Sequence, residues 1–302
     1  MYPDLSIIIC THNPRQDYLA RVLAALKNQT LSMNTWELLL IDNASDKILA
    51  SDIDLSWHPH SRHIREDELG LTPARLRGIR EAKAEILVFV DDDNVLDDDY
   101  LEAVFKISQN YQFIGAWGGK IRPEFEVTPP NWTKPYWNLL AIRDFESDRW
   151  SNLIHQNYTV PCGAGLCIRR VVAEKYNELL CQDAQRANLD RKGKLLTSCG
   201  DTDLALTACK IDLGTGQFTA LGLTHLIPAQ RIQEDYLIKL VQGIAYSSTI
   251  LKALWGEYPS QVSRSQKLFD FYMRLRMDTK SRRFYDASRA GKNLAIKNIS
   301  SW

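Results

Sequence analysis

The chain has 302 residues, 45% of them hydrophobic and 25% charged, a composition typical of a globular protein with a substantial core. Lysine plus arginine and aspartate plus glutamate each number 37, so the formal net charge is zero and no overall charge favours nucleic acid as a partner. No apolar run approaches the roughly 20 residues that a membrane-spanning helix needs. The six cysteines form no C-x-x-C pair, which indicates reduced thiols in a cytoplasmic protein.

Short apolar runs alternate with amphipathic segments in the first part of the chain. The runs 5–10, 36–41 and 86–90 are continuous and aliphatic, which is typical of parallel strands covered on both faces. The segments between them open with Asn13 and Pro14, and with Thr72 and Pro73, which are helix-start signals. This alternation predicts an α/β fold with a mostly parallel, Rossmann-like sheet flanked by helices. Ligands then bind beyond the carboxyl ends of the strands.

The remainder of the chain has a looser pattern. Residues 113–121, 163–168 and 218–223 resemble strands, whereas 171–180 and 202–213 have helical spacing. Residues 129–150 combine tryptophans and a tyrosine with prolines and are interpreted as a long ordered loop. From residue 231 onward the pattern is helical, and the last part is basic and amphipathic. We therefore predict one domain over 1–230 and a C-terminal helical region over 231–302.

Three carboxylates, Asp91, Asp92 and Asp93, directly follow the buried run 86–90. A turn or helix cap is one explanation, although Asp97 to Asp99, just before a helical run, occupy the position expected of a cap. Charge beside a buried strand is costly unless a cation compensates it. A site for Mg²⁺ or Mn²⁺ is therefore the second explanation. The triplet also fits the D-x-D-x-V nucleophile motif of haloacid-dehalogenase-type phosphatases, although two strand–helix units precede it here.

Several segments, in order, resemble the motifs of family 2 glycosyltransferases with the GT-A fold. They are SIIICTHN, LLLIDNASD, GLTPARLRGI, ILVFVDDDN, PCGAGLCIRR and CGDTDLAL, and they extend over roughly residues 4–230. The resemblance implies an inverting enzyme that moves a sugar from a nucleotide donor, UDP-linked in our prediction, to an acceptor hydroxyl. It also implies a divalent cation and a role in polysaccharide or glycoconjugate biosynthesis.

The resemblance assigns nucleotide contacts to Thr11, Asn13 and Asp42, an aspartate being suited to accept hydrogen bonds from uracil or ribose. Asn13 as a helix cap and Asp42 as a turn residue are the structural alternatives. Arg75 matches an arginine near the nucleotide and diphosphate, but Leu76 replaces the asparagine that usually follows it.

Within the triplet, the resemblance makes Asp93 the direct metal ligand and gives Asp91 a ribose or metal-water contact. Asp92 is grouped with the nucleotide-binding residues. His225 is a candidate third metal ligand, and a structural histidine is the alternative.

The catalytic base is implied in the segment CGDTDLAL, where Asp201 occupies the matching position and Asp203 takes the role if the register slips. A helix cap is the structural alternative for Asp201. Gly200 stands where the family often has glutamate, which keeps a non-catalytic nucleotide-sugar or glycan-binding protein open as an alternative.

The acceptor is expected to be a glycan or a lipid-linked molecule. The aromatic residues of 129–150 either stack on its sugar rings or pack over the sheet. Basic and aromatic residues of the C-terminal region, such as Arg282 to Tyr285, suit an anionic surface, so we predict peripheral contact with the inner face of the membrane; a solvated helix is the alternative.

Overall fold

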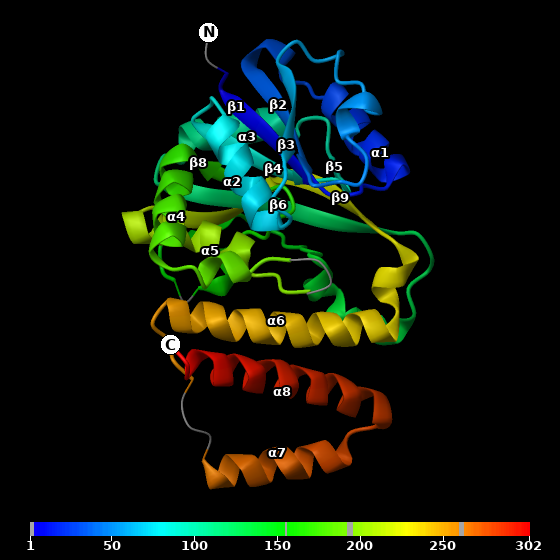
Figure 1. Cartoon of the computed structure of the whole chain (residues 1–302), viewed down its shortest axis with the longest axis vertical. Coiled ribbons are helices and arrows are strands. Elements are labelled where there is room, and N and C mark those ends of the chain that lie inside the picture. Colours follow the sequence, from blue (N-terminus) through cyan, green and yellow to red (C-terminus); the bar gives the residue numbers. More distant parts are fainter. Residues whose placement is uncertain (1–2, 155, 192–195, 260–262) are drawn as a thin grey trace.

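A computed structural model describes residues 3–154, 156–191, 196–259 and 263–302, which form a curved sheet flanked by helices, with a helical layer below it (Figure 1). The strands are β1 (Leu5–Thr11), β2 (Trp36–Asn43), β3 (Ser61–Glu66), β4 (Ile86–Asp91), β5 (Asn94–Leu96), β6 (Ile114–Phe125), β7 (Arg149–Ser151), β8 (Cys167–Arg169) and β9 (Gly214–Ile227). The helices are α1 (Gln16–Lys27), α2 (Leu71–Glu81), α3 (Tyr100–Asn110), α4 (Arg170–Gln182), α5 (Gly200–Leu206), α6 (Glu234–Leu254), α7 (Arg264–Arg276) and α8 (Thr279–Ile299).

The N-terminal half of the sheet is parallel, in the order β3-β2-β1-β4. Alternate residues of β1 enter two separate cores: Ile7 packs with the helices α1 and α3, whereas Ile8 packs with α2, α4 and α5. Both faces of these strands are therefore covered, which explains their continuous apolar sequences. Because β1, β2 and β4 run in the same direction, their polar carboxyl ends meet at one edge, with Thr11 opposite Asp42 and Cys10 opposite Asp91.

The second half of the sheet is mixed, since β8 is antiparallel to β4 and β6, while β9 is parallel to β6. The strand predicted over 163–168 is shorter and lies later, at β8, and the helix predicted over 202–213 is α5 followed by the 3₁₀ turn Thr207–Ile211. The strands β3, β5 and β7 were not predicted from the sequence. An edge strand such as β3 is covered on one side only, so it lacks the apolar run by which the central strands were recognised.

Two predicted helix starts were wrong. The helix α1 begins two residues after Pro14, and Asn13 has a left-handed backbone (φ 48°) instead of capping the helix. The helix α2 begins at Leu71, directly after Gly70, whose φ of 148° favours glycine. The expected cap before α3 is confirmed in position, at Asp99, but its side chain makes no capping hydrogen bond.

The C-terminal helices form the layer below the sheet (Figure 1). The helix α8 lies close against α6, and a Cβ added at Gly291 would come within 2.2 Å of the Gln242 carbonyl oxygen.

The segment 129–150, expected as a loop, contains the 3₁₀ helix Asn131–Leu140. Its Tyr136 stacks on Phe284 of α8, with ring centroids 4.1 Å apart. Trp137 packs on Phe125 of β6 and Trp150 stacks on Phe218 of β9, so packing, against both the sheet and α8, is the role that the structure shows for these aromatic side chains.

Candidate active site

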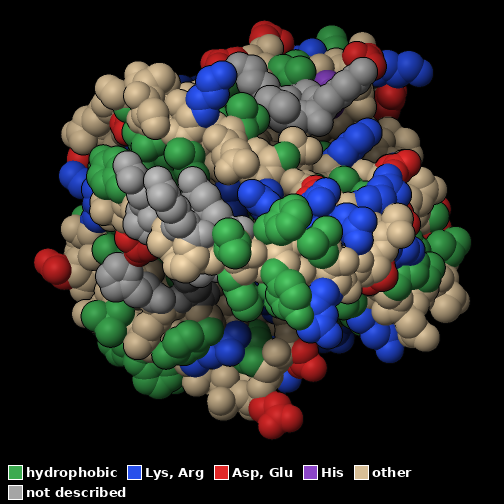
Figure 2. Space-filling model, turned by 90° about the horizontal axis from the view of Figure 1, so that it is seen from below, with side chains coloured by type: hydrophobic (Ala, Val, Ile, Leu, Met, Phe, Trp, Pro, Cys, Tyr) green, Lys and Arg blue, Asp and Glu red, His purple; other side chains and the backbone are tan. Residues whose placement is uncertain are grey.

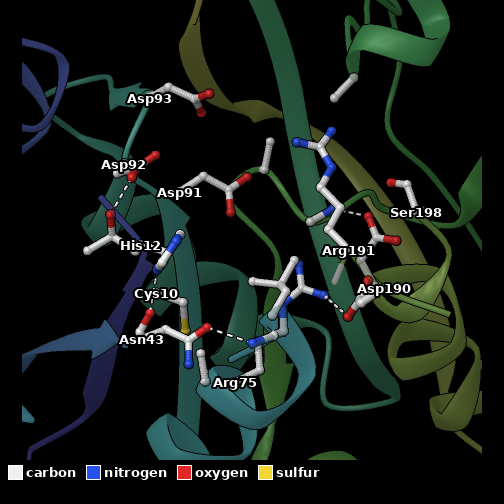
Figure 3. Close-up of a pocket in the computed structure, with 18 of the residues that line it drawn as sticks. Cys10, His12, Asn43, Arg75, Asp91, Asp92, Asp93, Asp190, Arg191 and Ser198 are labelled. Atoms are coloured by element: carbon white, nitrogen blue, oxygen red, sulfur yellow. Dashed lines mark hydrogen bonds and ion pairs between the residues drawn. The ribbon is translucent and has the colours of Figure 1, made fainter. Parts of the chain in front are cut away.

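A cavity of about 590 Å³ lies beyond the carboxyl ends of β1, β2 and β4 (Figure 3). Polar side chains from both halves of the chain line it, although they lie far apart in the sequence. They are Thr11, His12, Asn43, Arg75, Asp91, Asp92, Asp93, Asp190, Arg191, Ser198, Asp201, His225, Arg231 and Tyr236. The structure thus gathers most of the predicted site residues around one hollow.

The carboxylate triplet spans the turn between β4 and β5. Asp91 points into the cavity (Figure 3), and burial together with the charge of Asp93 raises the pKa of its carboxyl group. Asp92 accepts a hydrogen bond from the Thr11 hydroxyl, and burial is the main cause that raises its pKa to about 7. Three carboxylates held this close together and away from solvent attract a cation.

Asp93 is compensated by cationic and polar partners. Its Oδ2 lies 3.1 Å from Arg231 NH1 and 3.4 Å from His225 Nε2, and its Oδ1 accepts a hydrogen bond from Asn94. Burial raises the pKa of Asp93, but His225 and Arg231 outweigh this effect, so the pKa lies below its usual value.

The ring of His225 has a defined hydrogen-bonding arrangement. Nδ1 lies 3.0 Å from the Leu140 carbonyl oxygen and therefore donates, while Nε2 lies 3.1 Å from Arg231 NH1 and 3.4 Å from Asp93 Oδ2. The carbonyl bonded to Nδ1 leaves Nε2, on the side that faces Asp93, as the ring nitrogen for a metal. Across the described ranges, no group of three or more His, Cys, Asp and Glu side chains is arranged to hold a metal ion as it stands.

Arg75 is held in place by Asp190, a residue that was not predicted from the sequence. Arg75 NH1 lies 3.0 Å from Asp190 Oδ2, and both side chains are buried. Asp190 also accepts hydrogen bonds from the Thr72 hydroxyl and from the Gly200 N–H at the start of α5. The segment around Asp190 has no periodic pattern, so nothing in the sequence distinguished this carboxylate from a surface one. Leu76, the departure from the family pattern, packs against the core beneath the site.

Asp201 lies in the cavity and its carboxylate bridges two segments. Oδ2 accepts a 2.6 Å hydrogen bond from the Gly163 N–H, and Oδ1 accepts one from the Thr202 N–H. The N-cap of α5 is Cys199, so Asp201 does not serve as that cap.

Asp203 is placed differently from Asp201. It is fully buried outside the cavity, where it pairs with Arg186 and accepts a 2.7 Å hydrogen bond from the Trp255 indole N–H.

Two predicted nucleotide contacts lie at the same sheet edge but do not line the cavity. Asp42 accepts hydrogen bonds from the Ser45 and Leu49 N–H groups and pairs with Arg65 at 2.8 Å. Asn13 bonds instead to Asp46. Their neighbours His12 and Asn43 line the cavity in their place, joined by a 2.8 Å hydrogen bond from the His12 ring to the Asn43 carbonyl oxygen.

A sheet of this topology, with clustered carboxylates beyond β4 and an aspartate on α5, is the GT-A arrangement that the motifs predicted. In solved structures, the chain resembles the S. aureus TarS fragment 1–349, with a TM-score of 0.54 at 13% identity, over 99% of this chain and 90% of that one. The same fragment in complex with UDP matches with a TM-score of 0.52 at 12% identity, with the same coverage of both chains. These likenesses concern the fold.

Sequence comparisons are consistent with the fold. The model of glycosyl transferase family 2 matches residues 6–176, more than half of the chain. The chain therefore belongs to glycosyl transferase family 2. It is 26% identical over 107 residues to the putative glycosyltransferase EpsH of Bacillus subtilis, covering 34% of this chain and 30% of EpsH. It is 31% identical over 104 residues to polypeptide N-acetylgalactosaminyltransferase 8 of Drosophila melanogaster, covering 33% of this chain and 18% of that protein. The chain thus spans less than a third of the length of these relatives.

Proposed function

We propose that the protein is an inverting glycosyltransferase that moves a sugar from a nucleotide donor, UDP-linked, to an acceptor hydroxyl in polysaccharide or glycoconjugate synthesis. The observation that carries this proposal is the single cavity that joins the triplet Asp91 to Asp93 with Arg75 and Asp201. The family supports sugar transfer, and the UDP bound in the TarS fragment supports a UDP donor. Thr11, Asn13 and Asp42 remain our candidates for nucleotide contacts.

The diphosphate of the donor finds cationic partners in the cavity. Arg191 and Arg231 line the same hollow as the triplet, and the buried guanidinium of Arg75 faces it from α2. Planar guanidinium groups bind phosphate oxygens in a bidentate manner. Fixed donors of this kind stabilise the negative charge that develops on the departing diphosphate.

The residues also fit a divalent cation, Mn²⁺ or Mg²⁺. Asp93 and Asp91 supply carboxylate oxygens, and His225 places its Nε2 beside Asp93 while its Nδ1 is bonded to the Leu140 carbonyl oxygen. A cation bound there would neutralise the diphosphate as a Lewis acid. Arg231 at present contacts both Asp93 and His225, so metal binding requires its guanidinium to withdraw towards the diphosphate.

Asp201 is our choice for the general base. Its carboxylate lines the same cavity as the triplet and is oriented by the Gly163 N–H. A base there removes the proton of the acceptor hydroxyl as that oxygen attacks the anomeric carbon, while the bond to the diphosphate breaks on the other side, which inverts the configuration. Asp203 is less suitable, because Arg186 and Trp255 already bind its carboxylate.

Calorimetry with UDP in the presence of Mn²⁺ tests the donor and metal proposals together. We expect UDP binding that depends on Mn²⁺ and that is lost in Asp93→Ala, with a thermal-shift screen of nucleotide sugars identifying the donor. Unchanged UDP affinity in Asp93→Ala would reject the metal site. A dehalogenase-type phosphatase, the alternative, predicts a trapped phosphoaspartate at Asp91 instead. A non-catalytic binding protein predicts UDP binding without any turnover of the donor.

Within the predicted membrane-contact segment Arg282 to Tyr285, Phe284 is only 4% exposed and packs in a core, so the helix α7 is our candidate instead for contact with an anionic membrane on the cytoplasmic side. Leu268, Phe271, Tyr272 and Leu275 recur at helical spacing, and each is more than half exposed. The other side of the helix is tied to α8 by the Arg274–Asp286 ion pair. Figure 2 views this end of the molecule and shows hydrophobic side chains beside Lys and Arg side chains. Apolar and cationic groups together favour an anionic lipid surface.

Co-sedimentation with vesicles checks this contact. We expect binding to vesicles that contain phosphatidylserine and weak binding to phosphatidylcholine alone, and loss of binding in Phe271→Ser with Leu275→Ser. If the double variant sedimented with vesicles as the wild type does, a bilayer would be excluded as the partner of this helix face. The same holds if the wild type were a dimer that the double variant dissociates. In the described part of the chain, no helix has both the length and the apolarity to cross a membrane.

A further inference from the structure

A second cavity, of about 480 Å³, borders the first one. The two are lined by consecutive residues at three places: Gly163, Ser198 and Asp201 line the first cavity, and Cys162, Cys199 and Thr202 line the second. The carboxylate of Asp201 joins two of these places, because it accepts hydrogen bonds from the N–H groups of both Gly163 and Thr202. The proposed base therefore stands at the boundary between the two cavities.

The second cavity is rich in cations. Arg143, Arg149 and Lys252 line it from three separate segments, and Glu257 is its one acidic lining residue among those that the structure describes. None of the ion pairs between described residues includes one of these three cations. Glu257 has an interaction of its own. Three cations without a carboxylate partner around one hollow favour an anionic ligand.

Arg149 is the best-positioned of these cations. Its NH2 donates a 2.6 Å hydrogen bond to Gln217 Oε1, and Gln217 is itself anchored on the Val160 carbonyl oxygen. The guanidinium carbon lies 4.8 Å from the centroid of the Phe145 ring. Its Nε is buried, and within the described residues it has no hydrogen-bond partner. A buried charged N–H without a partner is costly, so such a group in a fixed guanidinium points to an acceptor that a ligand supplies.

The walls of the cavity also suit a sugar or polyol. Trp255 and Tyr158 line it, and the Trp255 ring is fixed because its indole N–H is bonded to the buried Asp203. Aromatic faces bind the apolar faces of such molecules while their hydroxyls stay hydrogen-bonded. The cavity thus combines an aromatic wall with cations that have no carboxylate partner among the described residues, and it lies beside Asp201.

We infer that the second cavity binds the acceptor, and that this acceptor carries an oxyanion, a phosphate or a carboxylate, which Arg149, Arg143 and Lys252 hold. This inference rests on the proposed function in so far as it assigns the anion to the molecule that receives the sugar. The anion fixes the acceptor so that a neighbouring hydroxyl lies against Asp201. Neutral sugars lack this contact and are poor acceptors.

Calorimetric titration with small anions tests the site. The probes are glycerol 1-phosphate and glucuronate, with glycerol and glucose as their neutral counterparts, added to the protein saturated with UDP and Mn²⁺ so that the first cavity is filled. We expect the two anions to bind and the neutral compounds not to bind. A preference for the phosphate or the carboxylate probe identifies which oxyanion the acceptor carries.

Variants locate the bound anion. Arg149→Gln should weaken binding at least about tenfold, the effect of losing one charge-assisted hydrogen bond. Lys252→Gln, at an exposed position where folding is not at risk, should weaken it to a smaller extent. Lys106→Gln, on α3 across the sheet, is the matched control and should leave the affinity unchanged. Equal affinity in all variants, or equal binding of glycerol and glycerol 1-phosphate, would overturn the inference.

A further variant separates this inference from the proposed function. Arg231→Gln removes a cation of the first cavity. An anion that bound in the first cavity would lose affinity in Arg231→Gln and keep it in Arg149→Gln. That result would also overturn the inference. Failure of UDP to bind would refute the donor proposal. The Arg149-dependent binding of glycerol 1-phosphate can still be measured in that case, because it needs no nucleotide.

Discussion

The two aspartates of α5 are chemically alike, yet the structure predicts that their replacement has opposite consequences. Asp201→Asn keeps an oxygen that accepts one of the two hydrogen bonds of the carboxylate, so the free energy of unfolding should change by about 1 kcal/mol or less. Loss of the base, however, should lower kcat about 10² to 10⁴-fold. In Asp203→Asn the reverse holds, since the change leaves Arg186 charged and buried without its partner.

The magnitude for Asp203→Asn follows from its burial. The side chains of Arg186 and Asp203 are 4% and 0% exposed, so solvent does not compensate the charge that remains. Breaking such a pair costs about 3–5 kcal/mol. For a chain of this size each kcal/mol shifts Tm by about 2 °C, which predicts a Tm lower by about 6–10 °C.

The assay compares UDP release from the donor with thermal unfolding for both variants. Asp212→Asn is the matched control, because Asp212 is exposed and has a left-handed backbone (φ 62°) that asparagine adopts readily. The reasoning would be refuted if Asp201→Asn released UDP at the wild-type rate, or if Asp203→Asn lost activity while its Tm stayed unchanged.

Three further predictions concern packing and pH. Gly163→Ala places a Cβ 2.8 Å from Arg75 NH2 and 3.2 Å from Asp201 Oδ2, so UDP release should fall while circular dichroism stays native; unaltered kinetics would contradict the close packing of this turn. Gly291→Val forces α8 away from the Gln242 carbonyl and should lower the free energy of unfolding by about 1–3 kcal/mol. Hydrogen exchange in α8 should become faster, and unchanged exchange would argue against the α6–α8 contact. Burial lowers the pKa of His58 from 6.5 to about 4, so between these pH values the unfolded chain binds a proton that the native state does not. The free energy of unfolding should therefore fall as the pH drops from 6.5 to 4, and it should fall less steeply in His58→Gln. Equal slopes for the wild type and His58→Gln would refute this prediction.

The central strands and their parallel direction could be predicted from the sequence. Each of β1, β2 and β4 is a continuous apolar run ending in polar residues, because both faces are buried and only the end is open. The same rule located the carboxyl-end residues Thr11 and Asp91 to Asp93. Asn13 and Asp42 lie at the same edge, but their side chains turn to local partners and do not line the cavity. Periodicity predicts on which face of a strand or helix a residue lies. It does not predict the hydrogen-bond partner of a single polar side chain, which depends on the groups that lie nearest to it.

What the sequence by itself determined is therefore the parallel half of the sheet, the family and the carboxylate triplet, since these depend on contiguous residues and their local spacing. The tertiary structure decided which distant residues join them. Asp190 reaches Arg75 across 115 positions, and Asp201 reaches Gly163 across 38. It also places Asp201 and Asp203 differently, although they are half a turn apart on one helix: Asp201 lines the cavity, and Asp203 enters a buried ion pair. Such contacts arise only when segments far apart in the chain pack together, and no local pattern encodes them.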